Sequence, residues 1–480
     1  MSLTERVAHG LSWSLAARIF TQGFQFAFGL ALARLLTPSD FGVVGMVFVI
    51  TGFALAFSDA GLSSALIYDQ EASDSHFSTV FWLQLGAGVF LTAVFYVAAP
   101  WISYFYEMPV LEPLSRLVAF TFVVQALGQT HSAMLSKHLR FKQLAVVNII
   151  STVASGAIAI ILAWRGYGVW SLAWQGLLAP VLTTFLLWLQ SRWRPSFVFD
   201  PRAAKTLGRY GLYLLGHTSI NYWLRNGDKL VIGKIIGAHD LGIYTRAYTL
   251  MLLPLNNIGA VLGQVMFPAL SQLQNDLPRF KRSYLSALQA IALITFPLMI
   301  GVAALCDPLV IFLLGPQWSE VTPILEILSL VGLVQSIIFP VGWVFAALGK
   351  TKEQFHLSIV LAFAFVVAVS AGIFFGIKGV AYAYALWTLL SAWLNLRLAG
   401  SFINLPMREV VRAVTKVLVM AIVMGAIVFA VDRNFLDSYP NFVRIASGSV
   451  IGIVIYLGLC MLTKDTAFVR VTGFVSARFL

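Results

Sequence analysis

The chain has 480 residues, of which 59% are hydrophobic and only 11% are charged, and its mean hydropathy is +0.85. A soluble domain is roughly 45–50% apolar and about 25% charged, so this composition excludes a soluble protein and indicates a polytopic membrane protein. The net charge of +12 comes from basic residues spread over several short segments. A nucleic-acid-binding surface would gather them in one patch or stripe, so nucleic acid is excluded as a partner.

Apolar runs of about 17 to 25 residues, each long enough to cross a bilayer, recur along the whole chain. The first run has no convincing cleavage site after it, so it is predicted to be a retained span rather than a signal peptide. The fold class predicted is therefore all-α, with about fourteen transmembrane helices. Their expected ranges are 11–36, 41–66, 77–100, 112–135, 143–164, 168–190, 207–236, 241–270, 284–306, 323–347, 354–376, 379–401, 409–431 and 443–462.

Most of the 32 basic residues fall in alternate loops of this helix scheme, as they do on the cytoplasmic side of membrane proteins. The loop 192–206 is the richest in Lys and Arg, and it is predicted to be cytoplasmic together with both termini. The loop 67–76 departs from the rule because it is acidic, although the scheme places it on the same side.

Residues 30–44 and 230–244 align without a gap at an offset of 200, so that Gly42 falls on Gly242. Each half would hold six helices, an even number, so both halves are predicted to be parallel repeats with a site between them. The alternative is a chance likeness between two amphipathic helix starts. The predicted domains are an N-lobe at 1–205, a C-lobe at 206–403, and an appendage of two helices with the cytoplasmic C-terminus at 404–480.

The stretch 209–248 is apolar enough to cross a membrane, yet it carries Arg225, Asp228 and Lys229 near its middle. A charged side chain at the centre of a membrane helix costs about 2.5–3.5 kcal/mol and usually faces a cavity, a partner or a substrate. Asp228 and Lys229 stand three and four residues after Arg225, so all three are predicted to share one helical face. One acid cannot neutralise two bases, which predicts a net-positive cavity that receives an anion. A purely structural ion pair is the alternative.

Five further candidates come from other positions in the spans. His217 and Asn221 precede the charged face, and Arg246 is expected near the depth of Lys229 on the following helix. All three are predicted to belong to the substrate-binding cavity. Arg18 and Asp59 are each expected roughly 10 Å inside the cytoplasmic face of adjacent helices, at ~1.5 Å of rise per residue. Two interpretations of this pair are open, a structural clasp and a coupling-ion site.

Signals for catalysis are absent from the sequence, which contains no metalloprotease or hydrolase motif and predicts no enzyme and no cofactor. The two cysteines, Cys306 and Cys460, lie in separate apolar stretches. They support neither a disulfide framework nor a metal site.

Four segments carry a resemblance to a known family: Arg225-Asn226-Gly227-Asp228-Lys229, Leu241-Gly242-Ile243-Tyr244, Phe267-Pro268-Ala269-Leu270-Ser271, and the run from Ala33 to Gly42. They resemble the polysaccharide-transporter branch of the multidrug/oligosaccharidyl-lipid/polysaccharide exporter superfamily, and within it the Wzx-type flippases of colanic acid, exopolysaccharide and lipopolysaccharide synthesis. The resemblance covers essentially the whole chain.

This resemblance implies two six-helix lobes forming a V in the bacterial inner membrane. It also implies that alternating access of the lobes moves an oligosaccharide repeat unit, linked to undecaprenyl pyrophosphate, from the cytoplasmic to the periplasmic leaflet. The lipid bilayer and polysaccharide polymerase or export proteins are the further partners implied. A pyrophosphate is the anion that the predicted net-positive cavity would hold.

Two other functions stay open at this point. A drug or cation antiporter of the same superfamily would favour acidic residues over basic ones in its cavity. A membrane glycan polymerase or ligase would need large periplasmic loops with catalytic side chains. The longest predicted outer loop, 307–322, has only Asp307 and Glu320 as acidic residues.

Overall fold

The computed structural model describes residues 3–59, 61–68, 72–201, 219, 222–223 and 226–463, and all the regular elements in these ranges are helices. The first half contains α1 (Leu3–Leu35), α2 (Pro38–Asp59), α3 (Leu62–Tyr68), α4 (Asp74–Tyr106), α5 (Leu111–Lys137), α6 (Phe141–Trp164) and α7 (Val169–Ser191). Residues 226–235 are also helical. The all-α prediction is confirmed.

The second half begins with a long helix, α9. Its elements are α9 (Ala238–Gln272), α10 (Leu277–Ala304), α11 (Cys306–Leu313), η1 (Pro316–Trp318), α12 (Val321–Ile338), α13 (Val341–Ala347), α14 (Thr351–Gly372), η2 (Ile373–Phe375), α15 (Gly376–Phe402), α16 (Met407–Val431), η3 (Asp432–Leu436) and α17 (Asn441–Leu462). Ten stretches of the described chain are long and apolar enough to cross a membrane, one of them spanning both α14 and α15. The number fourteen itself stays a prediction.

Apart from shifts at helix ends, three predicted segments are divided differently in the structure. The span expected at 41–66 is divided between α2 and α3, and Gly61 beside the break has a φ of 73°, which suits a glycine. Pro340 stands at the start of α13 and separates it from α12, where one bent helix was expected. Much of the expected loop 307–322 is helical, because α11 buries Pro308 and Val310.

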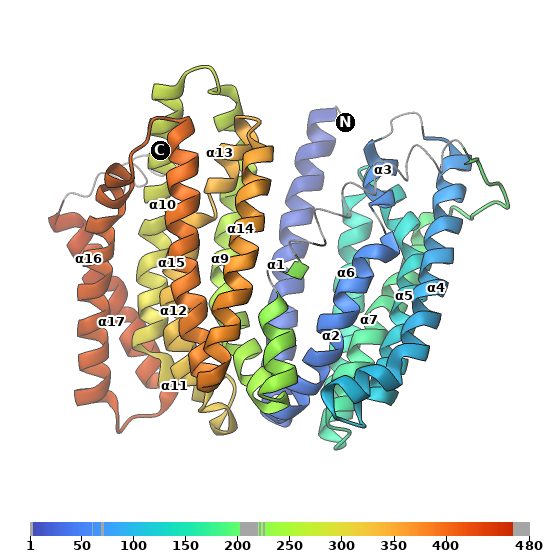
Figure 1. Ribbon diagram of the computed structural model, residues 1–480, viewed down its shortest axis with the longest axis horizontal. Helices are drawn as coiled ribbons and strands as arrows, with labels where there is room; N and C mark the ends of the chain where they lie inside the picture. The colour runs from blue at the N-terminus through green and yellow to red at the C-terminus, as the bar shows by residue number, and fades with distance from the viewer. Residues whose placement is uncertain are drawn as a thin grey trace. The chain divides into compact units, whose positions relative to one another are not determined.

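The chain forms two compact units, residues 1–242 and residues 243–480. In the first unit α4 packs against α5, α1 against α6, and α7 against both α5 and α6 (Figure 1). In the second unit α10 packs against α12 and α16, α15 against α12 and α14, and α17 against α16. The predicted lobe boundary at residue 205 lies outside the described residues.

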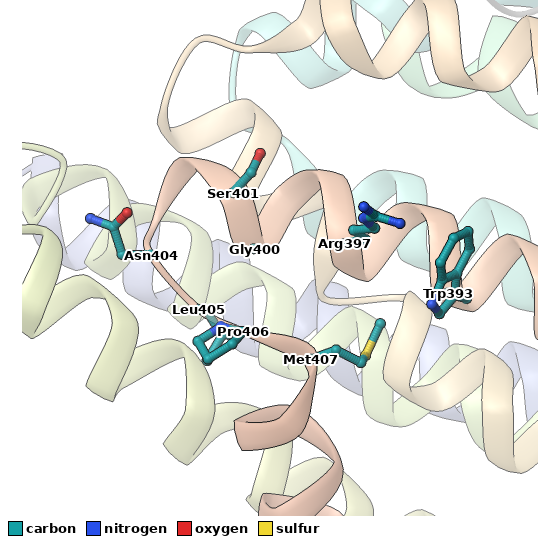
Figure 2. A pocket seen from close by; sticks show the side chains of 8 residues that line it. All are labelled: Trp393, Arg397, Gly400, Ser401, Asn404, Leu405, Pro406 and Met407. Carbon is teal, nitrogen blue, oxygen red and sulfur yellow. The ribbon is translucent and has the colours of Figure 1, made fainter.

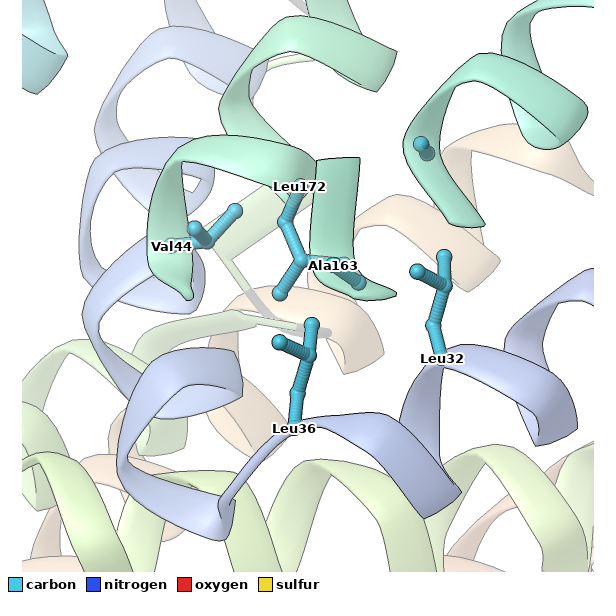
Figure 3. Packing of buried hydrophobic residues seen from close by; sticks show 6 residues of the cluster. Leu32, Leu36, Val44, Ala163 and Leu172 are labelled. Atoms are coloured by element: carbon cyan, nitrogen blue, oxygen red, sulfur yellow. The ribbon is translucent and has the colours of Figure 1, made fainter. Parts of the chain in front are cut away.

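A cluster of buried aliphatic side chains joins four helices of the first unit. Figure 3 shows Leu32 of α1, Leu36 from the link between α1 and α2, Val44 of α2, Ala163 of α6 and Leu172 of α7 gathered at one place. All of them are less than a tenth exposed. Such close packing fixes the start of α2, the helix on which part of the candidate site is built.

Large apolar side chains are exposed on the outer helices of both units. Phe90 of α4 is 66% exposed, Phe363 of α14 is 74% exposed and Leu386 of α15 is 68% exposed. Soluble monomers seldom expose so much apolar surface, whereas a membrane protein presents it to lipid. The exposure pattern therefore agrees with helices that stand in a bilayer.

Candidate functional site

Lys229, one of the two bases of the predicted anion-binding face, is held by a chain of hydrogen bonds. Its Nζ donates to Oδ1 of Asn226 at 2.9 Å, and Nδ2 of Asn226 donates to the backbone carbonyl of Tyr222 at 3.0 Å. Residues 222, 226 and 229 are spaced so that they share one face of a helix. The ammonium group is thereby fixed to its own helix while the side chain stays partly exposed.

Tyr222 connects this face to α2. Its hydroxyl donates to the backbone carbonyl of Val49 at 2.7 Å. Gly52 makes room for the ring, because a Cβ atom there would lie 2.6 Å from the tyrosine hydroxyl oxygen. Tyr222 and Asn226 were not among the site residues expected from the sequence, although their four-residue spacing was a signal for them.

Asp228 is 1% exposed, so a carboxylate of the predicted basic face lies inside the protein. Its Oδ1 accepts a hydrogen bond from the backbone N–H of Lys229 at 2.8 Å. Burying a carboxylate costs free energy unless it is paired or hydrogen-bonded, so this hydrogen bond helps to stabilise Asp228 inside the protein. Asp228 and Lys229 both belong to the first compact unit.

The other expected binding residues are only partly located. His217, Asn221 and Arg225 lie outside the described residues. Arg246 is partly buried on α9, and it belongs to the second unit, whereas Asp228 and Lys229 belong to the first. The hypothesis that these charges share one cavity therefore stays a prediction.

In the second unit, Gln335 of α12 takes part in a cross-helix network that centres on Tyr384 of α15. Its Nε2 donates to the hydroxyl of Tyr384 on α15 at 2.8 Å, and that hydroxyl lies 3.3 Å from the hydroxyl of Tyr248 on α9. Tyr384 also stacks on Trp387, with ring centroids 5.6 Å apart. Both tyrosines are buried, so this network ties α9 to α12 and α15 and positions the helix that carries Arg246.

Asp59, expected to pair with Arg18, takes its hydrogen bonds from other side chains in the described part of the chain. Its Oδ1 accepts from Oγ of Ser63 at 2.5 Å and from Nε2 of Gln84 at 2.7 Å. Oε1 of Gln84 accepts from Oγ1 of Thr130 at 2.6 Å. This network joins α2, α3, α4 and α5. The side chain of Arg18 lies outside the described part, so the clasp and the coupling site both stay predictions.

One buried ion pair lies away from these residues, at the turn between α16 and α17. Nε and Nη2 of Arg444 donate to the two carboxylate oxygens of Asp432 at 2.9 and 2.7 Å. The side chains are 10% and 4% exposed, and Asp437 adds a contact of 3.3 Å to the guanidinium. This pair closes the hairpin of the last two long helices. In the residues that the structure describes, no group of three or more His, Cys, Asp and Glu side chains is placed to hold a metal ion.

Comparison with known proteins begins with a family profile described as "Polysaccharide biosynthesis protein", which matches residues 31–323. The teichuronic acid biosynthesis protein TuaB of Bacillus subtilis (strain 168) is 28% identical over 462 residues, which cover 95% of this chain and 96% of TuaB. The lipopolysaccharide biosynthesis protein WzxC of Escherichia coli (strain K12) is 26% identical over 378 residues, covering 78% of this chain and 76% of WzxC.

The structure is similar to that of the lipid II flippase MurJ in an inward closed conformation. The TM-score is 0.76 at 17% sequence identity, over 95% of this chain and 98% of that one. At this identity the similarity concerns the fold alone, and it confirms the predicted all-helical membrane fold.

Proposed function

This chain belongs to the polysaccharide biosynthesis protein family, and from that membership we propose that it is a flippase for a lipid-linked oligosaccharide. The resemblance noted in the sequence is thereby confirmed at the level of the family. The proposal makes the chain a transporter rather than an enzyme. Its substrate is an oligosaccharide repeat unit on undecaprenyl pyrophosphate.

The observation that supports this proposal best is Lys229, a charged residue that is held in place by hydrogen bonds in a chain with few charges. A base within an apolar helix is costly unless it meets a partner, a cavity or a substrate, and Asn226 and Tyr222 fix this one in place. A fixed ammonium group suits a pyrophosphate, whose oxygens accept charge-assisted hydrogen bonds. Arg225 would add a planar fork of donors and Arg246 a third base, as the sequence predicts, with His217 and Asn221 facing sugar hydroxyls.

Asp228 has a different role in this proposal. A buried carboxylate between two bases orients Arg225 and limits the excess positive charge, so that the substrate is bound and also released. The Asp59 network is assigned to holding the N-terminal helices together, with Arg18 as the predicted further partner of Asp59.

Transport by alternating access requires two bodies that change their arrangement, and the two compact units of this chain supply them. We place the protein in the bacterial inner membrane with both termini cytoplasmic, because Lys and Arg gather in alternate loops. The direction of transport is then from the cytoplasmic to the periplasmic leaflet, where polymerase and export proteins would take the product.

The test is translocation of the native lipid-linked glycan in proteoliposomes at matched protein levels. Lys229→Ala and Arg225→Ala each remove a charge-assisted contact worth about 1.5–3 kcal/mol, so each should slow flipping by about tenfold or more. Lys234→Ala is the matched control, because that lysine stands five residues further on, pairs with Glu107 and is 32% exposed. Its expected rate is within about twofold of the native rate.

The proposal fails if both Lys229→Ala and Arg225→Ala flip the glycan at the native rate. Export of a cationic drug by the native protein, without glycan transport, would instead support an antiporter. Elongation of the glycan chain by the purified protein would support a polymerase.

A further inference from the structure

We propose that a cavity at the end of α15 in the second unit binds the phosphate headgroup of an anionic phospholipid. The cavity has a volume of about 640 Å³ and lies where α15 ends and α16 begins. Figure 2 shows the residues that line it, which are Trp393, Arg397, Gly400, Ser401, Asn404, Leu405, Pro406 and Met407. It is a different site from the charged face at Lys229, and it does not depend on the proposed function.

The polar lining comes from one face of α15 and from the turn after it. Trp393, Arg397 and Ser401 are four residues apart, which places them above one another on the helix (Figure 2). The guanidinium carbon of Arg397 lies 5.1 Å from the centre of the Trp393 ring, a cation–π contact that holds the charged group against the indole. The guanidinium can donate two parallel hydrogen bonds to a phosphate, and Ser401 and Asn404 carry further polar groups.

The turn that closes the cavity has a defined geometry. The backbone N–H of Leu405 donates to the carbonyl of Gly400 at 2.9 Å, and Asn404 has a φ of 51°. These are the features of a Schellman motif, in which the residue after the cap is left-handed and asparagine is tolerated. A side chain at position 400 would overlap with the carbonyl oxygen of Leu405, so Gly400 permits the tight turn. Pro406 is the N-cap residue of α16, which begins at Met407.

Glu409, the acidic residue in the first turn of α16, is paired with a lysine instead of with Arg397 in the part of the chain that the structure describes. Glu409 accepts a hydrogen bond from Nζ of Lys281 at 2.8 Å. The same ammonium group donates to the backbone carbonyl of Asn404 at 3.0 Å, which holds the turn from its other side. Arg408, next to Met407 of the lining, is exposed and adds a second positive charge close by. The cavity therefore attracts an anion.

The apolar part of the lining indicates a lipid rather than a free phosphate ion. Trp393, Leu405, Pro406 and Met407 offer apolar surface beside the polar groups, and the Trp393 side chain is 46% exposed. Two predicted spans end here, at the depth of the lipid headgroups, where tryptophan is enriched. In the predicted helix scheme, the link between 379–401 and 409–431 falls on the same side as the loop 192–206, which is predicted to be cytoplasmic. Basic pockets between helices on that side bind anionic headgroups. A phosphate ion would need the polar groups alone.

The test is native mass spectrometry of the full-length protein in detergent, titrated with phosphatidylglycerol and, separately, with phosphatidylcholine. We expect phosphatidylglycerol to bind at concentrations about tenfold lower than phosphatidylcholine, and Arg397→Gln to weaken it by about tenfold, as for the loss of a charged hydrogen-bonding partner. Arg433→Gln is the matched control, since its guanidinium carbon lies 5.0 Å from the centre of the Phe429 ring but it does not line the cavity. That variant should bind like the native protein.

Three outcomes would overturn the lipid site. One is equal binding of the two lipids by the native protein, and another is native phosphatidylglycerol binding by Arg397→Gln. The third is displacement of phosphatidylglycerol by inorganic phosphate at the same concentration, which would identify a site for the free ion. If Arg397→Gln lowers the melting temperature, a second variant tests the site. Ser401→Ala is a small change on an exposed residue, and it should weaken phosphatidylglycerol binding by less than Arg397→Gln does.

Discussion

A Cβ atom on Gly42 would overlap with the backbone carbonyl of Ala238, and one on Gly242 would overlap with the carbonyl of Pro38. Gly42 and Gly242 are 200 residues apart, and so are Pro38 and Ala238, so the second contact repeats the first with the two segments exchanged. Two segments that align in the sequence therefore cross each other reciprocally, at the first turns of α2 and α9. The absence of side chains lets the two backbones touch, as small residues do at membrane helix crossings.

Gly42→Ala and Gly242→Ala should both destabilise the protein. Each added methyl group would meet a backbone carbonyl that cannot rotate away, and overpacking of this kind costs about 1–3 kcal/mol or more. Gly45→Ala is the control, because its nearest neighbour would be Cδ2 of Leu241 at 3.5 Å. Thermal unfolding midpoints in detergent check the prediction. Equal unfolding midpoints for the three variants would contradict the close contact between the two backbones at this crossing.

Gln84→Leu should destabilise the first unit. The change removes the donor to Asp59 and the acceptor for Thr130, and leaves the buried Thr130 hydroxyl without Oε1 of Gln84. A buried polar group that has lost its hydrogen-bond partner destabilises the fold by about 1–3 kcal/mol. Gln289→Leu is the control, since its bond to the carbonyl of Ala413 is long, at 3.4 Å. Equal unfolding midpoints for the two variants would contradict the importance of this network.

Asp59→Asn separates the two interpretations of Asp59. The hydrogen bonds from Ser63 and Gln84 go to Oδ1, which asparagine keeps, while the negative charge is lost. If Asp59 is structural, flipping in proteoliposomes should stay within about twofold of the native rate. Normal unfolding combined with lost transport would instead assign the charge to ion coupling.

Arg444→Leu should destabilise the hairpin of α16 and α17. It would leave the Asp432 carboxylate buried without its bidentate partner, and breaking a buried pair from one side costs about 3–5 kcal/mol. The double change Asp432→Asn with Arg444→Leu should recover part of the loss, because no buried charge remains. The unfolding midpoints of the native protein and the two variants are the measurement, and a double variant no more stable than the single one would argue against the pair.

The pair of Lys234 and Glu107 predicts a small pH dependence. The hydrogen bond from Lys234, 2.7 Å long, lowers the pKa of the Glu107 carboxyl below its usual 4.5. A carboxyl whose pKa is lower in the folded state stabilises the fold at pH values above its unfolded pKa. That stabilisation is lost as the pH falls through the folded pKa. The Glu107 side chain is 80% exposed, so the effect is small.

Lys234→Met should therefore melt slightly below the native protein at neutral pH. The difference should shrink as the pH falls through the pKa of Glu107, since a protonated carboxyl no longer attracts the ammonium group. Unfolding midpoints over a pH series check this, and a difference that grows towards acid pH would contradict it.

Helix positions could be predicted from the sequence because apolar length alone defines a span. The range expected at 143–164 became Phe141–Trp164, and the one at 409–431 became Met407–Val431. Side-chain partners were harder to predict. Asp59 was matched with Arg18, whereas Gln84 of α4 supplies a hydrogen bond that the sequence did not indicate. A helix that is apolar nearly all round does not reveal which face meets its neighbour.

The candidate site shows the same limit. The three-and-four spacing predicts that Lys229 shares a face with Arg225 and Asp228. The hydrogen bond from Lys229 to the Asn226 amide depends on side-chain rotamers, which spacing does not give. The hydrogen bond from Tyr222 to α2 depends on the space left for the tyrosine ring by Gly52, which is far away in the sequence. The cavity at Arg397 arises from a turn whose left-handed residue is an asparagine instead of the usual glycine.

α9 starts at Ala238, inside the first unit, and continues to Gln272, inside the second, because the division falls between Gly242 and Ile243. A gene split at that division would cut a helix after its first turn. A split in the segment after α7 would avoid this, but Tyr222, which contacts α2, and Lys234, which contacts Glu107, would then be made with the second polypeptide. Co-expressed halves of this protein would therefore have to complete each other's fold, with the second fragment supplying a missing part of the first.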